Sequence, residues 1–503
     1  MKAWACLVLL AVSLPAHARS VRITVLHTND IHGWIMPRAA GTYGADPGRP
    51  IGGAAALAAY VKKVRGPKLL LDSGDWFQGT PEGTIRAGGS VVDVFNAVGY
   101  DALTVGNHEF DNGLPALQGL VQAARAPVVC SNVYGADGAR SSLFQPGIIK
   151  EVGGVKVGIF GLLTGNMKNL SFPDNIAGLT FRRGVDEAKD AVAALRAQGA
   201  TVVIALSHQG LEPPGAAGLE GDRFLAEHVA GIDLIVGGHT HTALKQGARD
   251  PVHGTLIVQA GTELLRVGVV GLEVDSRTGR VVKSSARLAD LWPDQTGSDP
   301  ALAKVVAGLN REVSAAYDVV LATAGAALTR NRDGESALGD WMTDCERRWA
   351  GADLAVQNGG SIRADIPAGP VTLRRLFEVM PFDNRVVKLV MKGKDVRSVL
   401  DHGVGLARMA QISGAEVSYR RRAPEGRRLT QAKVAGRELV DESTYTVATV
   451  DFLVKGGDDF TAFAAAQSAD FTKTMLRDLL RDCALERPSI QPPPASRLVP
   501  AGD

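Results

Sequence analysis

Gly106-Asn107-His108-Glu109-Phe110-Asp111-Asn112-Gly113 is the stretch that decides the fold, and it directly follows the apolar run 102–105. We interpret this run as a strand that opens into a loop. In such a loop Asn107 can offer a neutral oxygen to a metal ion, His108 a titratable imidazole, and Asp111 a carboxylate that fixes the tautomer of His108. Taken alone, the stretch fits an ordinary turn with solvated side chains. The choice depends on whether other segments end in the same way.

Four other apolar runs end in side chains of the same kind. The candidate ligands are Asp30 and His32 after residues 21–26, Asp75 after 69–71, His208 after 202–206, and His239 and His241 after 234–236. Because ligands bind at the carboxyl ends of strands in an α/β sheet, we expect these side chains and Asn107 to converge. Each residue alone would fit a turn or a buried, hydrogen-bonded histidine. Five such strand ends together predict a metal site.

The residue types indicate which ions would bind. Oxygen and imidazole ligands without cysteine suit two hard or borderline divalent ions, such as Zn, Mn, Co or Mg, better than a structural zinc site. Two such ions, about 3.5–4 Å apart, can share a carboxylate and activate a bridging water for in-line attack on phosphorus. The expected cofactor is therefore a pair of divalent metal ions.

From about residue 20 to about residue 490, the chain resembles the calcineurin-like metallophosphoesterases, and specifically the exported 5'-nucleotidase and UDP-sugar hydrolase family. The resemblance rests on the five motifs above. It implies an α/β fold, with a four-layer α/β/β/α sandwich that holds the metals and a second α+β domain at the C-terminus. The predicted divisions are a signal peptide at 1–18, the metallophosphoesterase domain at 19–330, a linker helix at 331–350 and the substrate-binding domain at 351–503.

The same resemblance implies roles for the motif residues. Asp30, His32 and His241 would bind one metal ion, Asn107, His208 and His239 the other, and Asp75 both. His108, held by Asp111, would stabilise the transferred phosphoryl group or protonate the leaving oxygen. His241 departs from the pattern, since many members of this branch carry an amide side chain there. Imidazole is a competent ligand, so we expect the site still to bind metal. The histidine would instead change which metal ion the site prefers.

The second half contains a glycine-rich segment, 357–365, whose backbone amides could approach an anion. Arg363 could add a bidentate clamp on phosphate. Taken alone, the segment fits a glycine-rich hairpin with a solvated arginine better than a phosphate-binding segment. The family resemblance reverses that preference. It implies that this segment contacts substrate and adds further candidates from the stretch 381–385. The substrate-binding candidates of these two stretches are Asn358, Gly360, Arg363, Asn384 and Arg385.

A nucleoside pocket is predicted around Phe452, which precedes the flexible stretch Gly456-Gly457-Asp458. An aromatic ring can stack on a flat base, while a loop carboxylate bonds to polar groups nearby. Without context Phe452 fits a core residue beside a turn, and the resemblance favours stacking by Phe452 and hydrogen bonding by Asp458. The family usually supplies a second aromatic residue, and here Met409 takes its place. Methionine packs on a ring less selectively, which puts base specificity in doubt.

Length and charge limit the partners. At 503 residues the chain is expected to form two or three domains, and a formal charge of +2 gives no general attraction to nucleic acid. The expected partner is a small nucleotide and not a nucleic acid polymer. No membrane anchor is expected, because no run beyond the N-terminus approaches the about 20 apolar residues that a membrane span needs. A monomer is expected, and a dimer is left open.

The N-terminus predicts export. Lys2 is followed by the apolar run 3–14 and by Ala16-His17-Ala18, an A-x-A cleavage pattern. Cleavage after Ala18 would give a periplasmic or secreted protein. Three cysteines would remain, and their pairing is left open; they are Cys130, Cys345 and Cys483.

The leading interpretation is a two-domain dimetal phosphohydrolase that releases phosphate from nucleoside 5'-monophosphates in nucleotide catabolism and could also cleave UDP-sugars. One alternative keeps the metal centre but acts on 2',3'-cyclic nucleotides, 3'-nucleotides or sulfur-linked sulfate. Another, of a different class, is an exported nucleotide-binding protein without catalysis. The complete set of motif residues argues against loss of catalysis.

Overall fold

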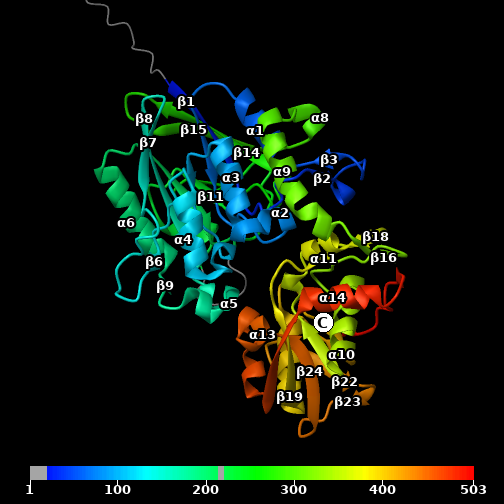
Figure 1. The fold of residues 1–503 in the computed structure, drawn as a ribbon. Helices are drawn as coiled ribbons and strands as arrows, with labels where there is room; N and C mark the ends of the chain where they lie inside the picture. The colour runs from blue at the N-terminus through cyan, green and yellow to red at the C-terminus, as the bar shows by residue number, and fades with distance from the viewer. Residues whose placement is uncertain (1–19, 213–219, 503) are drawn as a thin grey trace, which may run out of the picture.

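The computed structural model describes residues 20–212 and 220–502. The predicted signal peptide lies outside the described residues. The chain forms two halves, with the first sheets and helices above and the C-terminal sheets below in Figure 1. Among the described residues, no helix combines the length and apolar character needed to cross a bilayer.

Two sheets face each other in the first half. The first has the order β15-β14-β1-β4-β5, with β15 at Val281–Asp290, β14 at Arg266–Asp275, β1 at Ser20–Thr28, β4 at Lys68–Asp72 and β5 at Ala102–Leu103. The second has the order β12-β13-β11-β10-β8-β7, with β12 at Ala248–Arg249, β13 at Leu256–Val258, β11 at Leu234–Gly237, β10 at Val202–His208, β8 at Val155–Leu163 and β7 at Ile148–Val152. In each sheet the strands that carry the motifs run parallel to one another.

Alternating side chains on these strands explain the layers. On β10, Val202, Ile204 and Leu206 enter the core shared by the two sheets, whereas Val203 and Ala205 face a second core. A strand buried on both faces reads as a continuous apolar run, and that is why the motif strands were visible in the sequence.

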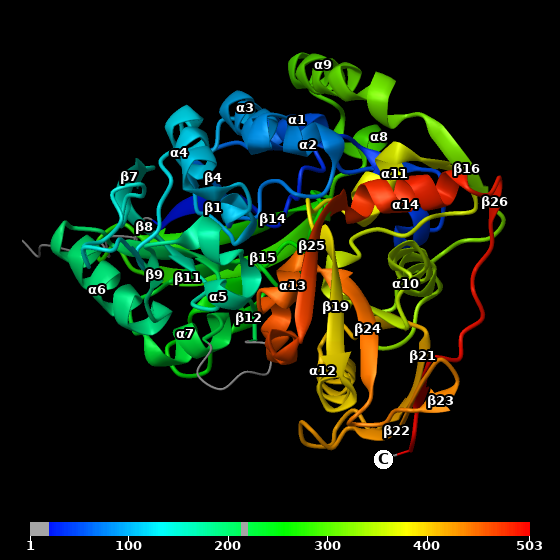
Figure 2. The same ribbon diagram turned by 60° about the horizontal axis from the view of Figure 1, so that its bottom comes forward.

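Helices cover both outer faces of the sandwich (Figure 2). One outer core includes residues of α1 (Ala54–Lys63), α3 (Gly89–Val98), α4 (Gly113–Ala123) and α9 (Pro300–Tyr317). The other includes residues of α6 (Gly184–Ala197) and α7 (Asp222–His228). The predicted four-layer α/β/β/α arrangement is therefore confirmed.

The second half has its own core, built on a mixed sheet with the order β20-β17-β24-β19-β25. These strands span Gln411–Ser413, Leu354–Gln357, Thr444–Val450, Arg385–Lys392 and Ser468–Met475, in that order. Two smaller sheets flank it, with the orders β18-β16-β26 and β23-β22-β21-β27. Their strands are β18 at Gly369–Thr372, β16 at Val320–Ala324, β26 at Ser489–Ile490, β23 at Arg437–Glu438, β22 at Leu429–Val434, β21 at Ala415–Tyr419 and β27 at Leu498–Pro500. This half is the second α+β domain that the sequence predicts.

Four longer helices pack in or around this second core: α10 at Ala337–Ala350, α11 at Leu373–Val379, α12 at Gly393–Gly405 and α14 at Leu476–Leu485. The helix predicted as a linker, 331–350, corresponds to α10, which buries Leu338 and Trp341 in this core. A disulfide between Cys345 and Cys483 joins α10 to α14, while Cys130 is free and buried.

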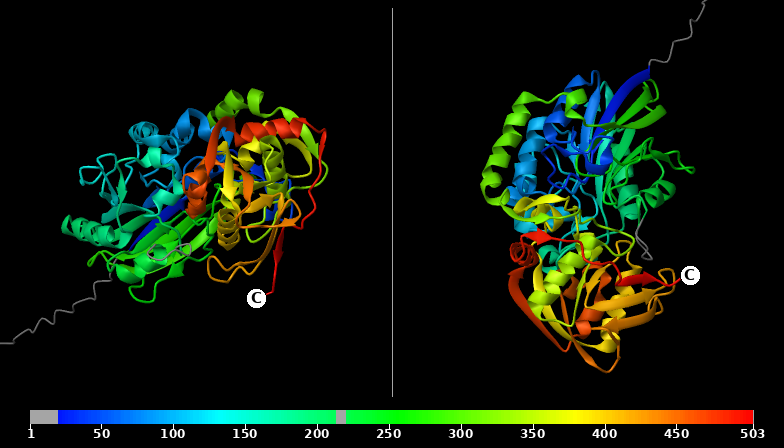
Figure 3. Two further views of the ribbon diagram at one scale, coloured as in Figure 1. Left: turned by 90° about the horizontal axis from the view of Figure 1, so that it is seen from below. Right: turned by 90° about the vertical axis from the view of Figure 1, so that its right-hand side faces the viewer.

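The halves meet near α9 and α11 (Figure 3). Tyr317 at the end of α9 packs edge-on against Phe377 of α11. Arg374 of α11 pairs with Glu82 of the first half and donates a hydrogen bond to Asn310 of α9. These contacts hold the glycine-rich segment of the second half against the motif loops of the first.

Candidate metal centre

The motif side chains form two groups at the carboxyl ends of their strands. One group is Asp30, His32, Asp75 and His241, and the other is Asp75, His208 and His239. Within each group, the potential ligand atoms all lie within 4.8 Å of one another. Asn107 adjoins the second group, because its Oδ1 lies 3.0 Å from Nδ1 of His239. The structure thus brings together all seven residues predicted to bind metal, and Asp75 belongs to both groups.

The backbone at these residues is unusual. Five of them adopt a left-handed conformation that few non-glycine residues occupy; they are Asp30, His32, Asp75, His239 and His241. Such backbone strain is concentrated at functional sites, where it fixes the direction of side chains. Gly106 is also required, because a Cβ atom there would overlap Oδ1 of Asp75 and lie 2.7 Å from Cε1 of His208. The loops are therefore built to hold the ligands close together.

Unsatisfied nitrogen atoms test whether the site fits metal ions. Nε2 of His208 is buried and makes no hydrogen bond, although it lies 3.2 Å from Oδ2 of Asp75. Nε2 of His32 faces Nε2 of His241 at 3.0 Å. Two imidazole nitrogens that point at each other, with carboxylates around them, form a donor set suited to divalent ions. The residues present fit the predicted pair of metals.

The protonation of the histidines agrees with this role. Burial lowers the pKa of His239 to about 4, and also lowers the pKa values of His32 and His241, so these imidazoles are neutral ligands near pH 7. His208 differs: burial opposes its charge, but the carboxylates of Asp75 and Asp30 outweigh burial and raise its pKa to about 10. A divalent ion bound by the same carboxylates would compete with that proton.

Glu109 supports the site from behind, a role the sequence did not reveal. Its buried carboxylate accepts hydrogen bonds from the backbone amides of Asp75, Trp76 and Gly106. It therefore ties the loop of the shared carboxylate to the loop of Asn107. The only sequence signal is its place inside the motif, because hydrogen bonds to distant amides cannot be read from a pattern.

His108 lies on the open side of the cluster. Its Nδ1 lies 2.8 Å from Oδ2 of Asp111, as expected for a pair that fixes the tautomer. Its Nε2 lies 3.9 Å from Oδ2 of Asp75. Burial lowers the pKa of His108, but the charges of Asp111 and Asp75 outweigh burial and raise it. The ring also stacks on Phe382 of the second half, with centroids 5.5 Å apart.

Arg363 brings the second half to the metal cluster. A terminal nitrogen of its guanidinium lies 3.3 Å from Nε2 of His32 and 3.4 Å from Nε2 of His108. The other terminal nitrogen lies 3.4 Å from the carbonyl oxygen of Gly360. The glycine-rich segment thus carries a cation to the edge of the cluster.

The remaining substrate candidates lie in different surroundings. Asn358 donates a 2.6 Å hydrogen bond to Asp458, so these two residues act as one polar unit. Gly457 is required beside Phe452, because a Cβ atom there would overlap the phenyl ring. Phe452 itself meets Phe172 of the first half edge-on, with centroids 5.8 Å apart.

Among the described residues, Arg363 is the only substrate-binding candidate in the lining of the cavity between the halves. Met409 is fully buried in the second core, so its side chain does not take the place of an aromatic clamp there. The neighbouring Arg408, in the bend after α12, lines the cavity instead. Asn384 is buried, and Arg385 has an exposed side chain, while its backbone amide donates to Asp451.

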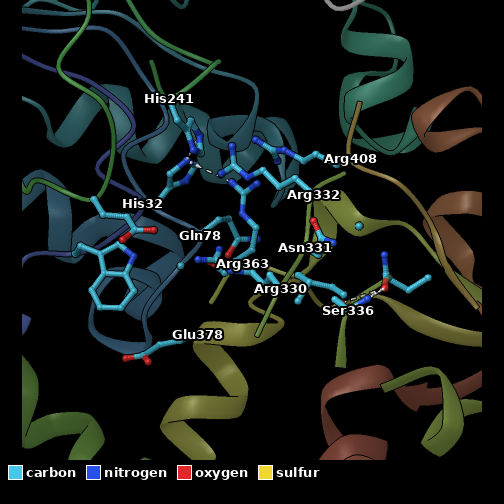
Figure 4. A pocket seen from close by; sticks show the side chains of 16 residues that line it. His32, Gln78, His241, Arg330, Asn331, Arg332, Ser336, Arg363, Glu378 and Arg408 are labelled. Carbon is cyan, nitrogen blue, oxygen red and sulfur yellow. Dashed lines mark hydrogen bonds between the residues drawn. The ribbon is translucent and has the colours of Figure 1, made fainter. Parts of the chain in front are cut away.

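A cavity lies between the halves, and its lining includes His32 and His241 of the metal cluster (Figure 4). Four arginines line it: Arg330, Arg332, Arg363 and Arg408. Only Arg363 was predicted. Arg330 and Arg332 precede α10 in the chain, and the packing of the two halves turns them toward the cluster.

Comparisons with known proteins agree with this geometry. A family model described as calcineurin-like phosphoesterase matches residues 23–243, and one described as 5'-nucleotidase, C-terminal domain, matches residues 313–465. The crystal structure of a 5'-nucleotidase precursor from Thermus thermophilus is 30% identical and covers 96% of this chain and 100% of that chain, with a TM-score of 0.88. The chain belongs to the 5'-nucleotidase family.

Other members of the 5'-nucleotidase family match over most of their length. The 5'-nucleotidase of Vibrio cholerae is 29% identical, over 96% of this chain and 93% of the relative. Protein UshA of Yersinia enterocolitica is 28% identical, over 87% of this chain and 86% of the relative. Calcineurin-like phosphoesterases use two divalent metal ions, and the two residue groups described above provide a place for each.

Proposed function

We propose that this protein is a 5'-nucleotidase that uses two divalent metal ions to release phosphate from nucleoside 5'-monophosphates. The observation that carries the proposal is a pair of metal-binding groups that share Asp75, with His108 and Arg363 on their open side. Asp30, His32 and His241 would hold one ion together with Asp75. His208, His239 and Asn107 would hold the other, also with Asp75.

When bound, the two ions supply Lewis acidity and an activated water for attack on phosphorus. Arg363 donates hydrogen bonds to phosphoryl oxygens, and its charge offsets the negative charge that grows on them in the transition state. His108 carries a proton on Nε2 and gives it to the leaving 5' oxygen, while Asp111 holds the ring through Nδ1. This division of tasks needs residues from both halves of the chain.

The nucleoside would lie toward the second half. Phe452 offers an aromatic face, and the Asn358–Asp458 unit offers polar atoms near it. The rings of Phe172 and Phe452 are nearly perpendicular, with centroids 5.8 Å apart, so we expect that a base can stack on Phe452 only when the two rings separate. Relative movement of the halves would separate them, since the rings belong to different halves.

Hydrolysis assays would test the proposal. The mature protein is stripped with chelator and single metals are restored. The products of hydrolysis are then measured: phosphate from AMP, UMP and glucose 1-phosphate from UDP-glucose, adenosine monophosphate from 2',3'-cyclic AMP, and sulfate from a thiosulfate-linked substrate. The proposal predicts metal-dependent hydrolysis that is fastest with AMP. Additional hydrolysis of UDP-glucose would fit the expected activity on UDP-sugars. Failure of every nucleotide to be hydrolysed with any metal would refute the nucleotidase assignment.

We further propose that the protein is exported and acts as a monomer. The disulfide between Cys345 and Cys483 supports an oxidising compartment, in agreement with the leader-like composition of residues 1–18. A single chain provides both the metal ligands and Arg363, so the site needs no second copy. N-terminal sequencing of the periplasmic and secreted fractions, and light scattering of the mature protein, would test the two points.

A further inference from the structure

The turn at residues 456–459 presents Asp458, a candidate of the nucleoside pocket, in an unusual backbone conformation. Asp458 has a φ of 51°, and its neighbour Asp459 has a φ of 61°. Few non-glycine residues adopt this left-handed conformation, and two in succession persist only where surrounding contacts hold them. The turn therefore depends on support from other elements of the second half.

Two hydrogen bonds hold Asp458, one through its side chain and one through its backbone. Asn358 donates to the carboxylate at 2.6 Å. Nε2 of His402, in the last turn of α12, lies 2.8 Å from the backbone carbonyl oxygen of Asp458. A carbonyl oxygen can only accept a hydrogen bond, so Nε2 of His402 carries the hydrogen in this contact. His402 is not among the residues that the sequence predicts for the site.

The ring of His402 is itself fixed from two further sides. Its Nδ1 lies 3.2 Å from a carboxylate oxygen of Glu425. The ring also meets Phe460 edge-on, with centroids 4.7 Å apart and an interplanar angle of 76°. Only 16% of the His402 side chain is exposed. The imidazole therefore cannot turn away from Asp458 without losing these other contacts.

The hairpin that carries Glu425 is attached to the same helix as His402. The carboxylate of Asp401 accepts hydrogen bonds from the backbone amides of Gly426 and Arg428, at 2.6 Å and 2.7 Å. Asp401 is buried, so these bonds are shielded from water. The helix, the hairpin and the turn at residues 456–459 thus form one connected unit with His402 between them.

The same turn also touches the aromatic ring of the nucleoside pocket. Gly457 lies against Phe452, because a Cβ atom at Gly457 would come within 2.4 Å of the ring. A shift of the turn would therefore change how the carboxylate of Asp458 and the ring of Phe452 lie relative to each other. The three contacts of His402 described above are all to the second half, so they support the turn and not the metal cluster.

We propose that His402 is a positioning residue for the nucleoside part of the substrate. By donating to the backbone of Asp458, it holds the turn so that the Asp458 carboxylate and the Phe452 ring can bind one nucleoside together. The proposal rests on the proposed function, in which the nucleoside of a 5'-monophosphate lies beside these two residues. His402 acts through Asp458 and does not touch the substrate, so its removal should weaken nucleoside binding without changing the step at phosphorus.

The test uses the metal-loaded protein and two substrates. AMP carries the nucleoside, whereas glycerol 1-phosphate is also the phosphate ester of a primary alcohol but has neither base nor ribose. His402→Ala removes the donor, His402→Gln keeps a donor near the position of Nε2, and His402→Asn places its amide nearer the position of Nδ1. His228→Ala is the matched control, because Nδ1 of His228 also lies near a backbone carbonyl oxygen, that of Phe224, at 2.9 Å.

We expect His402→Ala and His402→Asn to raise KM for AMP by about 10-fold, as fits the loss of one hydrogen bond that holds the turn. The kcat for AMP and the kcat/KM for glycerol 1-phosphate should stay as in the parent, because only binding of the nucleoside is weakened. His402→Gln and His228→Ala should keep the parent KM. An unchanged KM in His402→Ala, an equal loss with glycerol 1-phosphate, or a KM in His402→Gln as high as in His402→Asn would overturn the positioning role.

Binding of adenosine separates failure of the positioning role from failure of the nucleotidase assignment. Thermal unfolding of the metal-loaded protein is recorded with and without adenosine, which has no phosphate to lose. Adenosine should raise the unfolding temperature of the parent, His402→Gln and His228→Ala more than that of His402→Ala. If AMP is not hydrolysed and this difference persists, only the nucleotidase assignment fails. If AMP is hydrolysed and adenosine stabilises His402→Ala as much as the parent, only the positioning role fails.

Discussion

The metal cluster and the arginine-lined cavity lie side by side, yet their residues reach the site in different ways. Each metal ligand follows a parallel strand of the sandwich, so the position of the ligand is determined locally by the strand and its loop. The cavity arginines come from a connecting segment, the glycine-rich segment and the bend after α12. Their positions depend on how the two halves pack. The cluster should therefore govern whether the chemistry occurs, and the cavity should govern which substrate is used.

The most severe test of the cluster is the shared carboxylate. Asp75→Asn removes a charge from both metal-binding groups, and we expect phosphate release to fall by about 10³-fold or more with fewer than two metals bound per chain. Metal analysis and steady-state rates check both points. The exposed surface residue Asp93, changed to Asn, is the control. Two tightly bound metals in Asp75→Asn would mean that Asp75 is not a shared ligand.

His108 separates chemistry from metal binding. His108→Ala removes the proton donor but no predicted ligand, so turnover should fall by about 10²–10⁴-fold while two metals remain bound. His228→Ala serves as a control, since His228 stacks on Phe224 on α7, outside the cluster. An unchanged rate for His108→Ala would remove this residue from the proposed chemistry.

Asp75 and His108 were predicted from the sequence, but most of the cavity arginines were not. The difference has a physical reason. His108 and Asp75 follow short buried strands whose apolar runs are visible, and the edge where such strands end is known in advance. Arg408 and Met409 differ by one position, and only the packed structure shows which of them faces the cavity. Glu109 was equally hidden, because it acts through amides more than 30 residues away in the chain. Local patterns thus predict ligands, and tertiary packing decides the selectivity residues.

Arg363 tests the contribution of the second half to the first. Arg363→Lys keeps the charge but loses the planar fork, and we expect kcat/KM to fall by about 10–100-fold because charge-assisted bonds to phosphate are lost. Bound metal should be unchanged. Kinetics of AMP hydrolysis and metal analysis of the same preparations provide the comparison. A rate equal to that of the parent would show that the guanidinium does not contact the transferred group.

Glu109 tests whether loop support matters as much as ligation. Glu109→Gln replaces one acceptor oxygen by a donor, so it cannot accept from all three amides, and we expect metal affinity to fall by about 10–100-fold. Competition titration with a metal indicator measures the affinity. Glu187→Gln is the matched control, because Glu187 is also buried in the first half but bonds to Tyr134. Equal metal affinity in both variants would exclude a positioning role for Glu109.

The smallest effect on activity is expected at Glu346, in the second core. Its carboxylate is buried, neither oxygen has a hydrogen-bond partner among the described residues, and burial raises its pKa to about 8. Between about pH 4.5 and pH 8 the folded protein keeps a proton that the unfolded chain releases, so stability falls as pH rises, by up to about 1.4 kcal/mol per pH unit. Above this range the loss is complete.

Glu346→Gln should flatten that part of the pH dependence and raise the free energy of unfolding above pH 8, with kcat unchanged. Denaturant unfolding from pH 5 to pH 9 measures the slope. Glu416→Gln, at an exposed position of β21, should leave the slope as in the parent. The same slope in Glu346→Gln and in the parent would show that Glu346 does not keep its proton in the folded state.

The most direct test of the central claim is a metal titration of the stripped protein, with AMP hydrolysis as the readout. The proposed dimetal site predicts that phosphate release is absent without metal and rises to a plateau at two equivalents per chain. Release that persists in the stripped protein, or a plateau at one equivalent, would contradict a mechanism that depends on both groups around Asp75.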